Sequence, residues 1–127
     1  SFSLESQEYQ ILLKIVEAEA GGEDTIGKML VANVVMNRVR SSHFPDTVTE
    51  VVYQRHNGKA QFSPTADGRI DRVHVSADTV EAVERVMNGE DASAGATYFK
   101  SVRSKSGWHD RALNRVLQHG NHIFYAL

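Results

Sequence analysis

The sequence of 127 residues contains no cysteine, two prolines and one tryptophan. Without cysteine the chain forms no disulfide, offers no thiolate nucleophile and has no Cys ligands for zinc. Its formal net charge of −2 gives no electrostatic support to a nucleic-acid partner. No apolar run approaches the roughly 20 residues that a helix needs to cross a bilayer. We therefore expect neither thiol chemistry, nor nucleic-acid binding, nor a membrane span.

What the chain does contain is typical of one globular domain with its own core. Hydrophobic residues make up 41% of it and charged residues 24%, as in ordinary soluble domains. At this length we expect residues 1–127 to form a single domain, and we expect it to act as a monomer. The chain opens Ser-Phe-Ser without methionine, which favours a processed form or an excised domain.

Hydrophobic periodicity predicts four helices and places one of them at the centre of the fold. Apolar residues occupy most of the circumference of the second helix, which is typical of a buried helix. The third begins at a Thr-x-x-Glu capping box. The predicted helices run from Glu8 to Ala20, from Thr25 to Val39, from Thr47 to Tyr53, and from Ser76 or Ala77 to Met87.

The remaining segments lack helical periodicity. Residues 54–75 contain the turn signal Asn57-Gly58 and are expected to be irregular or to form a hairpin. Residues 96–99 and 122–125 are expected to be short strands or extended segments, and residues 101–109 a polar loop. The sequence therefore predicts a mainly helical α+β domain with a small β element.

Three glutamates surround the end of the first predicted helix, and local geometry separates them. Glu17 is expected on the polar face as a solvated charge, and Glu23 precedes the second helix, whose N-terminus favours a carboxylate. Glu19 lies in the last turn, where the helix dipole disfavours its ionised form and burial would raise its pKa further. A carboxyl group that keeps its proton suits general acid catalysis. The adjacent Gly21-Gly22 is expected to leave room for a bulky substrate.

The acidic residues also bear on the type of reaction. A glycosidase needs an acid that protonates the leaving oxygen, and either a second carboxylate or another nucleophile. Asp46 follows a proline and Asp67 precedes a glycine, positions that are typical of turns. The sequence therefore favours a one-acid mechanism in which the substrate supplies its own nucleophile.

Seven blocks of sequence keep a fixed order and cover nearly the whole chain. They are Glu19–Glu23, Gly27 with Val31–Val39, Phe44–Thr47, Val51–Tyr53, Gln61–Pro64, Ala96–Phe99 and Gly120–Tyr125. Together these blocks resemble the catalytic domain of the SleB-type cell-wall hydrolases, the spore cortex-lytic family. The resemblance implies a lysozyme-like, mostly helical fold related to lytic transglycosylases and resuscitation-promoting factors.

The resemblance also implies an activity and a location. Glu19 stands where the family has its single catalytic glutamate. That residue would cleave peptidoglycan between N-acetylmuramic acid and N-acetylglucosamine and close a 1,6-anhydro ring on the muramoyl C6 hydroxyl. The enzyme would be exported to the cell envelope, with the spore cortex as one destination. The alternatives are a hydrolytic muramidase, a non-catalytic peptidoglycan-binding module and, disfavoured by its weak ligand set, a metal-dependent amidase.

Two positions depart from the family pattern. Gly21 stands where the family often has arginine. Lys100-Ser101 follows Tyr98-Phe99, where the family commonly has another aromatic residue and then Asn-Pro. We therefore expect a different sugar-binding edge in the loop after Phe99.

Five residues are predicted to bind substrate, and four of them have a structural alternative. The Gln61 amide can bind sugar groups or its own backbone, and Ser63 can contact sugar or cap a turn. Phe62 is a further candidate, although core packing is the favoured role for its ring. Tyr98 alternates with its neighbour across a strand and is the better groove residue of the two. Trp108 can stack on a sugar or anchor its loop.

Histidines raise the question of a metal site. His119 and His122 are three residues apart, and His109 is nearby. None belongs to a ligand pattern with an acidic residue such as His-Glu-x-x-His, so we expect neither a metal nor another cofactor. Asn121 is expected to secure the C-terminal turn.

Overall fold

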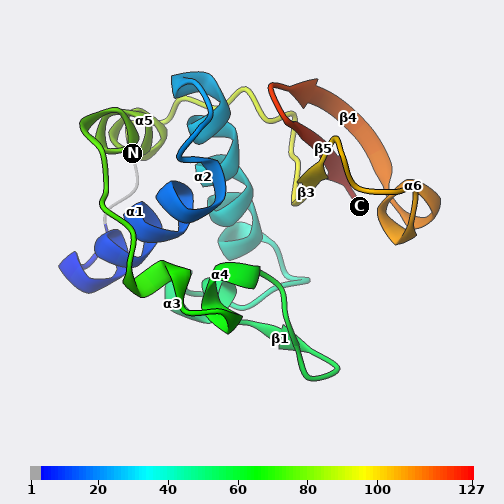
Figure 1. The fold of residues 1–127 in the computed structure, drawn as a ribbon, viewed down its shortest axis with the longest axis horizontal. Helices are drawn as coiled ribbons and strands as arrows, with labels where there is room; N and C mark the ends of the chain where they lie inside the picture. Colours follow the sequence, from blue (N-terminus) through cyan, green and yellow to red (C-terminus); the bar gives the residue numbers. More distant parts are fainter. Residues whose placement is uncertain (1–3) are drawn as a thin grey trace.

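The computed structural model describes residues 4–127 (Figure 1). We call residues 4–91 the helical body and residues 92–127 the C-terminal lobe. The body contains α1 (Ser6–Ala20), α2 (Thr25–Arg40), α3 (Val48–Val52), β1 (Arg55–His56), β2 (Lys59–Ala60), α4 (Ser63–Ala66), the 3₁₀ helix η1 (Arg69–Asp71) and α5 (Ala77–Met87). The lobe contains β3 (Tyr98–Ser101), α6 (Trp108–Ala112), β4 (Asn114–His119) and β5 (His122–Ala126).

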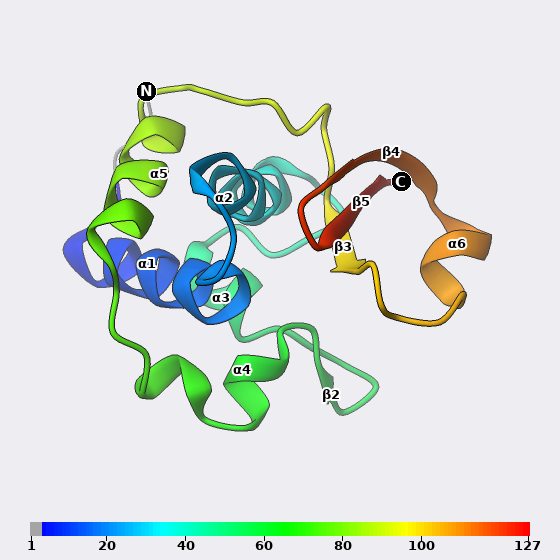
Figure 2. The same cartoon turned by 45° about the horizontal axis from the view of Figure 1, so that its top comes forward.

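Helix α2 is the centre of the body, as the sequence predicts. It packs against α1, α3 and α5, and Figures 1 and 2 show it between these helices and the sheet of the lobe. Residues 29–36 are all buried. Asp24 caps its start by accepting the Gly27 N–H at 2.8 Å. Because burial of apolar side chains is the main favourable term in folding, the core forms around this helix.

Local capping fixes the starts of α3 and α5. Thr47 Oγ1 accepts the Glu50 N–H at 3.1 Å, and Ser76 Oγ accepts the Thr79 N–H at 3.1 Å. A side-chain oxygen that accepts an otherwise free N–H in the first turn stabilises a helix by about 1 kcal/mol. The predicted starts of both helices are confirmed.

The lobe is built on a three-stranded antiparallel sheet of order β3-β5-β4. Its central strand buries residues 123–125, and Figure 2 shows α6 at the edge of the molecule, beyond the sheet. Three hydrogen bonds from α2 join the lobe to the body, one of them from Asn37 Nδ2 to Ser93 Oγ at 2.9 Å. Asn37 Nδ2 donates to Ala96 O at 2.9 Å, and Arg38 Nε donates to Thr97 O at 2.7 Å.

The mainly helical α+β class with a small β element is confirmed. In the segment 54–75 the structure contains the expected hairpin and also two short helices that were not expected. The expected hairpin forms as β1 and β2, with Asn57 and Gly58 in left-handed backbone at φ 51° and 77°. The same segment also contains α4 and η1, which the sequence does not predict. Elements of four and three residues are too short to carry a periodic pattern.

The lobe departs further from the expectations. Trp108 begins α6 instead of lying in a loop, because Asp110 Oδ2 accepts the Gly107 N–H at 3.1 Å and closes the first turn. Strand β3 begins at Tyr98, two residues later than expected. Strand β4 is not predicted, since its largely exposed residues lack an apolar alternation and it forms by pairing with β5. Every helix within residues 4–127 is too short or too polar to span a lipid bilayer.

Candidate active site

Glu19 lies in the last turn of α1 and is partly buried. Burial raises the pKa of Glu19 to about 7; the Arg69 guanidinium opposes the rise and the Asp67 carboxylate adds to it. No hydrogen bond from residues 4–127 offsets the burial. At neutral pH the group is therefore present in both protonated and ionised forms, as a residue that acts first as acid and then as base requires.

Glu17 is not the solvated charge that the sequence suggests. Its Oε1 accepts the Ser76 N–H at 3.0 Å and the Thr79 hydroxyl at 2.6 Å. Burial alone would raise the pKa of Glu17, but these hydrogen bonds hold it below its usual range. A Cβ on Gly21 would overlap the Glu17 carboxylate, whereas a Cβ on Gly22 would meet nothing within 4 Å. Gly21 therefore makes room for Glu17, and only Gly22 faces open space.

Glu23 binds the lobe and does not act as the N-terminal partner of α2, a role that Asp24 takes. Its carboxylate accepts the N–H and the side-chain amide of Asn121 at 2.9 and 3.0 Å. Burial alone would raise the pKa of Glu23, but these hydrogen bonds hold it below its usual range. Gly120, at φ +55°, lies against Glu23, where a Cβ would overlap the carboxylate. Asn121 thus secures the C-terminal turn, as predicted, and it does so by binding Glu23.

The α4–η1 loop packs against α1 and carries an ion pair. Arg69 donates its Nε–H to Asp67 Oδ2 and its backbone N–H to Asp67 Oδ1, both at 2.9 Å. Its Nη2 also donates to Ser63 Oγ at 3.0 Å, so the Ser63 hydroxyl binds Arg69 and does not cap a turn. Gln61 is exposed, and its amide makes no hydrogen bond with residues 4–127. Ser63 therefore lies beside the ion pair that influences the pKa of Glu19, and the side chain of Gln61 is exposed to solvent.

Tyr98 and Trp108 belong to one aromatic group on the lobe. Their ring centroids lie 5.5 Å apart, and the Tyr98 ring also contacts His109, with centroids 6.1 Å apart. The Trp108 side chain is 51% exposed, so much of its ring faces solvent. We call Tyr98, Trp108 and His109 the aromatic platform. Phe99 lies on the opposite side of β3 from Tyr98 and packs against Phe124, as strand alternation predicts.

The buried Arg38 lies behind this platform. Its guanidinium carbon is 4.9 Å from the ring centroid of Tyr98, 4.8 Å from that of Phe44 and 5.1 Å from that of Phe62. Burial lowers the pKa of Arg38 to about 10, so the side chain stays cationic at neutral pH. Phe62 is 2% exposed and belongs to the hydrophobic core. Core packing is thus confirmed for Phe62, and its ring is closed to substrate.

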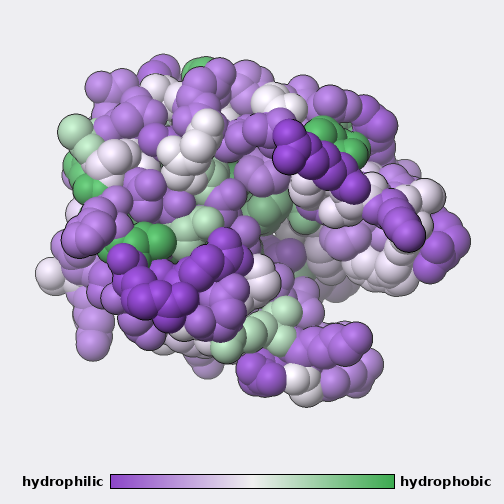
Figure 3. Space-filling model, in the orientation of Figure 1, coloured by the Kyte–Doolittle hydropathy of each residue, from purple (hydrophilic) through white to green (hydrophobic). Residues whose placement is uncertain are grey.

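The predicted site residues fall into two sets, one on the helical body and one on the lobe. Figure 3 shows the surface hollowed between the helical body and the lobe. Figures 1 and 2 show that α1 ends near the middle of the molecule, with α4 and the sheet on different sides. Glu19, Ser63 and Gln61 belong to the body, and Tyr98 and Trp108 to the lobe. An extended substrate that contacts both sets would cross the hollow.

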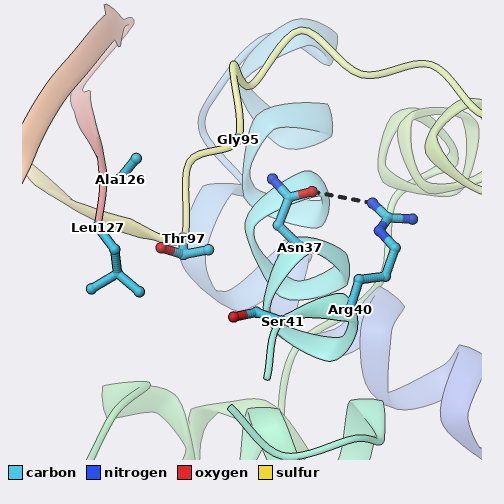
Figure 4. A pocket seen from close by; sticks show the side chains of 7 residues that line it. All are labelled: Asn37, Arg40, Ser41, Gly95, Thr97, Ala126 and Leu127. Carbon is cyan, nitrogen blue, oxygen red and sulfur yellow. Dashed lines mark hydrogen bonds between the residues drawn. The ribbon is translucent and has the colours of Figure 1, made fainter. Parts of the chain in front are cut away.

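A separate pocket lies between the end of α2 and the end of β5 (Figure 4). None of the predicted site residues lines it, and its lining contains no Asp or Glu side chain to act as an acid. Asn37 Oδ1 is already bonded to Arg40 Nη2 at 3.1 Å. The pocket has a volume of about 380 Å³ and is lined by Asn37, Arg40, Ser41, Gly95, Thr97, Ala126 and Leu127.

The three histidines considered for a metal site have other neighbours. His119 Nε2 lies 2.8 Å from Asp24 Oδ1, and the His122 ring contacts the Phe99 ring at 5.1 Å between centroids. His109 belongs to the aromatic platform. In the described part of the chain, no three His, Asp or Glu side chains gather as a metal ion needs.

Sequence reasoning missed two residues that shape the site. Arg69 influences Glu19 from 50 positions along the chain, and no local pattern points to that meeting. Arg38 does leave a signal, because it follows the buried apolar run of α2. A cation in such a run is a candidate for a buried, partnered charge.

Comparisons with known proteins agree with the fold. The family model for cell wall hydrolases matches residues 22–125, a range that begins just after Glu19. The spore cortex-lytic enzyme of Halalkalibacterium halodurans is 36% identical over 118 residues, which cover 91% of this chain and 33% of that protein. That of Bacillus subtilis is 30% identical over 122 residues, 94% of this chain and 37% of that protein. The chain thus spans about a third of the length of these relatives.

Solved structures extend the likeness over α1. The catalytic domain of the germination-specific lytic transglycosylase SleB from Bacillus anthracis superposes with a TM-score of 0.84 at 27% identity, covering 99% of both chains. The catalytic domain of the Bacillus cereus SleB protein gives 0.82 at 27% identity, covering 99% of this chain and 94% of that one. The chain therefore belongs to the cell wall hydrolase family, with the fold of the SleB catalytic domains.

Proposed function

We propose that this domain cleaves the glycan strands of peptidoglycan between N-acetylmuramic acid and N-acetylglucosamine, with Glu19 as acid and then base. The observation that carries the proposal is the state of its carboxyl group, which is partly buried, takes no hydrogen bond from residues 4–127 and has a pKa of about 7. Membership of the cell wall hydrolase family supports the substrate class. The name of the Bacillus anthracis relative, a lytic transglycosylase, supports the reaction type.

In the first step, protonated Glu19 gives its proton to the bridging glycosidic oxygen. The bond from C1 of the muramoyl residue to that oxygen breaks, and positive charge develops at C1. In the second step, the ionised Glu19 takes the proton of the muramoyl C6 hydroxyl, whose oxygen bonds to C1. The products are a 1,6-anhydro-muramoyl end and a free N-acetylglucosamine hydroxyl, and no water is consumed.

General acid and base assistance of this kind contributes roughly 10²–10⁴-fold to a rate. Positioning must supply much of the remainder. We propose that Gln61 and Ser63 bind polar groups of the strand on the body side of the hollow. On the lobe side, Tyr98 supplies a hydroxyl, and Trp108 supplies an exposed ring face that suits the apolar face of a sugar.

A hydrolytic muramidase is the second candidate, because Asp67 is close enough to influence the pKa of Glu19. In that reaction Asp67 would activate a water molecule, which then attacks C1. Both of its carboxylate oxygens, however, already accept hydrogen bonds from Arg69. A carboxylate held in this way is a weaker base, so cyclisation remains the favoured reaction.

The test is digestion of purified peptidoglycan followed by mass spectrometry of the released fragments. We expect wild-type domain to release anhydro-muropeptides, each lighter by one water than the hydrolytic product. Glu19→Gln keeps the shape of the side chain but has no proton to give, so its rate should fall by roughly 10²–10⁴-fold. Glu17→Gln, two residues away, should keep activity near that of the wild type at a temperature where both variants are folded.

Near wild-type release by Glu19→Gln would remove Glu19 from its role. Hydrolytic ends instead of anhydro ends would favour the muramidase, and binding to sacculi without any release would favour the non-catalytic module. We further propose that residues 1–127 form one catalytic domain, which acts as a monomer in the cell envelope. The spore cortex is the location that the names of the curated relatives suggest.

A further inference from the structure

Charge is divided unevenly between the lobe and the body. Residues 92–127 contain five of the 14 Lys and Arg residues but only one of the 16 Asp and Glu residues, so they carry a formal charge of +4, whereas residues 1–91 carry −6. The single acidic residue of the lobe, Asp110, is already bonded to Lys100. The lobe therefore presents unneutralised positive charge on a chain that is weakly acidic as a whole.

Three of these cations lie close in sequence to the exposed tryptophan of the aromatic platform. Lys105 lies three residues before Trp108, and Arg111 lies three residues after it. Arg103, like Lys105, belongs to the connection between β3 and α6. All three are exposed. Their side chains make no hydrogen bond or ion pair with residues 4–127. Cationic groups that no described residue binds are available to an anionic ligand.

We propose that the C-terminal lobe recognises the carboxylates of peptidoglycan stem peptides, which project from the same strand whose sugar stacks on Trp108. The inference rests on the proposed function, because it takes the strand to lie across the hollow beside the platform. A sugar ring offers an apolar face to the indole. The stem peptides offer carboxylates, which pair with guanidinium and ammonium groups in charge-assisted hydrogen bonds.

The negative charge of the body should orient the bound strand. Its charge of −6 repels the carboxylates that the lobe attracts, and such fields orient a charged ligand before contact. Stem peptides near the bond to be cleaved should therefore point toward the lobe. A neutral polymer of N-acetylglucosamine has no carboxylates, and it gains only the stacking contact.

The test measures binding to insoluble polymers by co-sedimentation, in the Glu19→Gln background so that the solids are not digested. Three solids are compared: peptidoglycan stripped of phosphate-bearing polymers, the same material with its carboxylates amidated, and chitin. Adding Lys105→Gln and Arg111→Gln should weaken binding to the stripped peptidoglycan roughly three- to tenfold, as expected for two exposed ion pairs. Binding to the amidated material and to chitin should not change.

A matched control removes the same charge from the body. Lys14→Gln with Arg85→Gln changes one residue on α1 and one on α5, which lie on the opposite side of the molecule from α6 (Figure 1). Binding to the stripped peptidoglycan should change by less than about twofold, since screening limits the reach of distant charges. Added salt should remove the difference between the two double variants.

Equal affinity of the two double variants for the stripped peptidoglycan would overturn the proposal. So would an equal loss on native and amidated material, or a failure of the Glu19→Gln domain to bind peptidoglycan at all. These failures are distinct from a failure of the proposed cleavage. A wild-type domain that binds in the expected pattern but releases no fragments would contradict the reaction and leave the role of the lobe standing.

Discussion

The helical body and the C-terminal lobe are held by different kinds of interaction. The body has an aliphatic core, in which Leu12, Ile15 and Val34 are completely buried. The lobe adds Ala96 and Phe124 to this core, and directional polar contacts also join it to the body, among them the hydrogen bond from Arg38 to Thr97 O. Apolar burial is non-directional and supplies most of the stability, whereas hydrogen bonds fix orientation. The body thus provides a rigid place for an acid, and polar contacts set the position of the opposite wall.

The same difference separates the three glutamates near the end of α1. Glu17 and Glu23 each bind a partner from a distant segment and stay ionised, Glu17 within the body and Glu23 across to the lobe. Glu19 lies between them in sequence and has no such partner in the described part of the chain, so burial is the largest influence on its pKa. One helix end therefore carries two structural carboxylates and one that is suited to proton transfer.

The largest effect on stability is expected at Arg38. Arg38→Met keeps an unbranched aliphatic chain but removes a hydrogen bond to a carbonyl and contacts with three aromatic rings. We expect the free energy of unfolding to fall by about 2–4 kcal/mol, measured by urea denaturation. Arg55→Ala on the exposed hairpin is the control, with a loss below about 1 kcal/mol. An unchanged or more stable Arg38→Met would mean that desolvation of the buried cation outweighs its contacts.

The next prediction is that Glu19→Gln and Glu17→Gln change the stability of the domain in opposite directions at pH 8. A carboxyl whose pKa is raised to about 7 by folding reduces stability progressively as pH rises from about 4.5 to about 7. Glu19→Gln removes this loss, so it should stabilise the domain by about 2 kcal/mol at pH 8 and have little effect at pH 4. Glu17 has a lowered pKa, and Glu17→Gln should destabilise the domain at pH 8. Thermal melts of both variants at pH 4 and pH 8 test this prediction. A change of melting temperature in the same direction for both variants at pH 8 would contradict it.

A smaller effect is expected at the contact between Glu23 and Asn121. Glu23→Gln keeps the shape but weakens two charge-assisted hydrogen bonds, at a cost of about 1–2 kcal/mol. Because the pKa of Glu23 is lowered in the folded state, this contribution is present at neutral pH and is lost as acid protonates the carboxylate. Glu90→Gln, which breaks an exposed pair with Arg85, should cost less than about 1 kcal/mol. Equal melting temperatures for the two variants would mean that the Glu23–Asn121 contact between body and lobe stabilises the domain no more than the surface pair of Glu90 and Arg85.

The smallest effect on stability, and a selective one on binding, is expected at Trp108. Trp108→Ala removes a half-exposed ring, so the free energy of unfolding should fall by less than about 1 kcal/mol. Affinity for insoluble peptidoglycan should fall by roughly three- to tenfold, as for loss of one stacking contact. Tyr53→Ala, which removes another exposed aromatic residue at 43% exposure, is the matched control. The aromatic platform would have no part in binding if both variants kept wild-type affinity.

Local signals explain what the sequence predicted well. The helices α1, α2, α3 and α5 follow from periodicity and capping residues within a few positions of each helix. A raised pKa for Glu19 was expected from its place in the last turn of an apolar helix, although burial is its largest cause in the structure. The burial of Phe62 was also the favoured expectation. The helices depend on interactions between near neighbours in the chain, whereas these two burials depend on the folded structure.

Other features depend on residues that are far apart in the chain. Ser76 lies 59 residues from Glu17, and Asn121 lies 98 residues from Glu23, so no spacing pattern links them. Strand β4 exists because β5 pairs with it. The sequence alone determined the helical body and the position of Glu19 within it, since periodicity and capping are local. Only the tertiary structure decided which of its neighbours keep their charge and which surface faces the acid, because burial and hydrogen bonding depend on chain segments that meet only after folding.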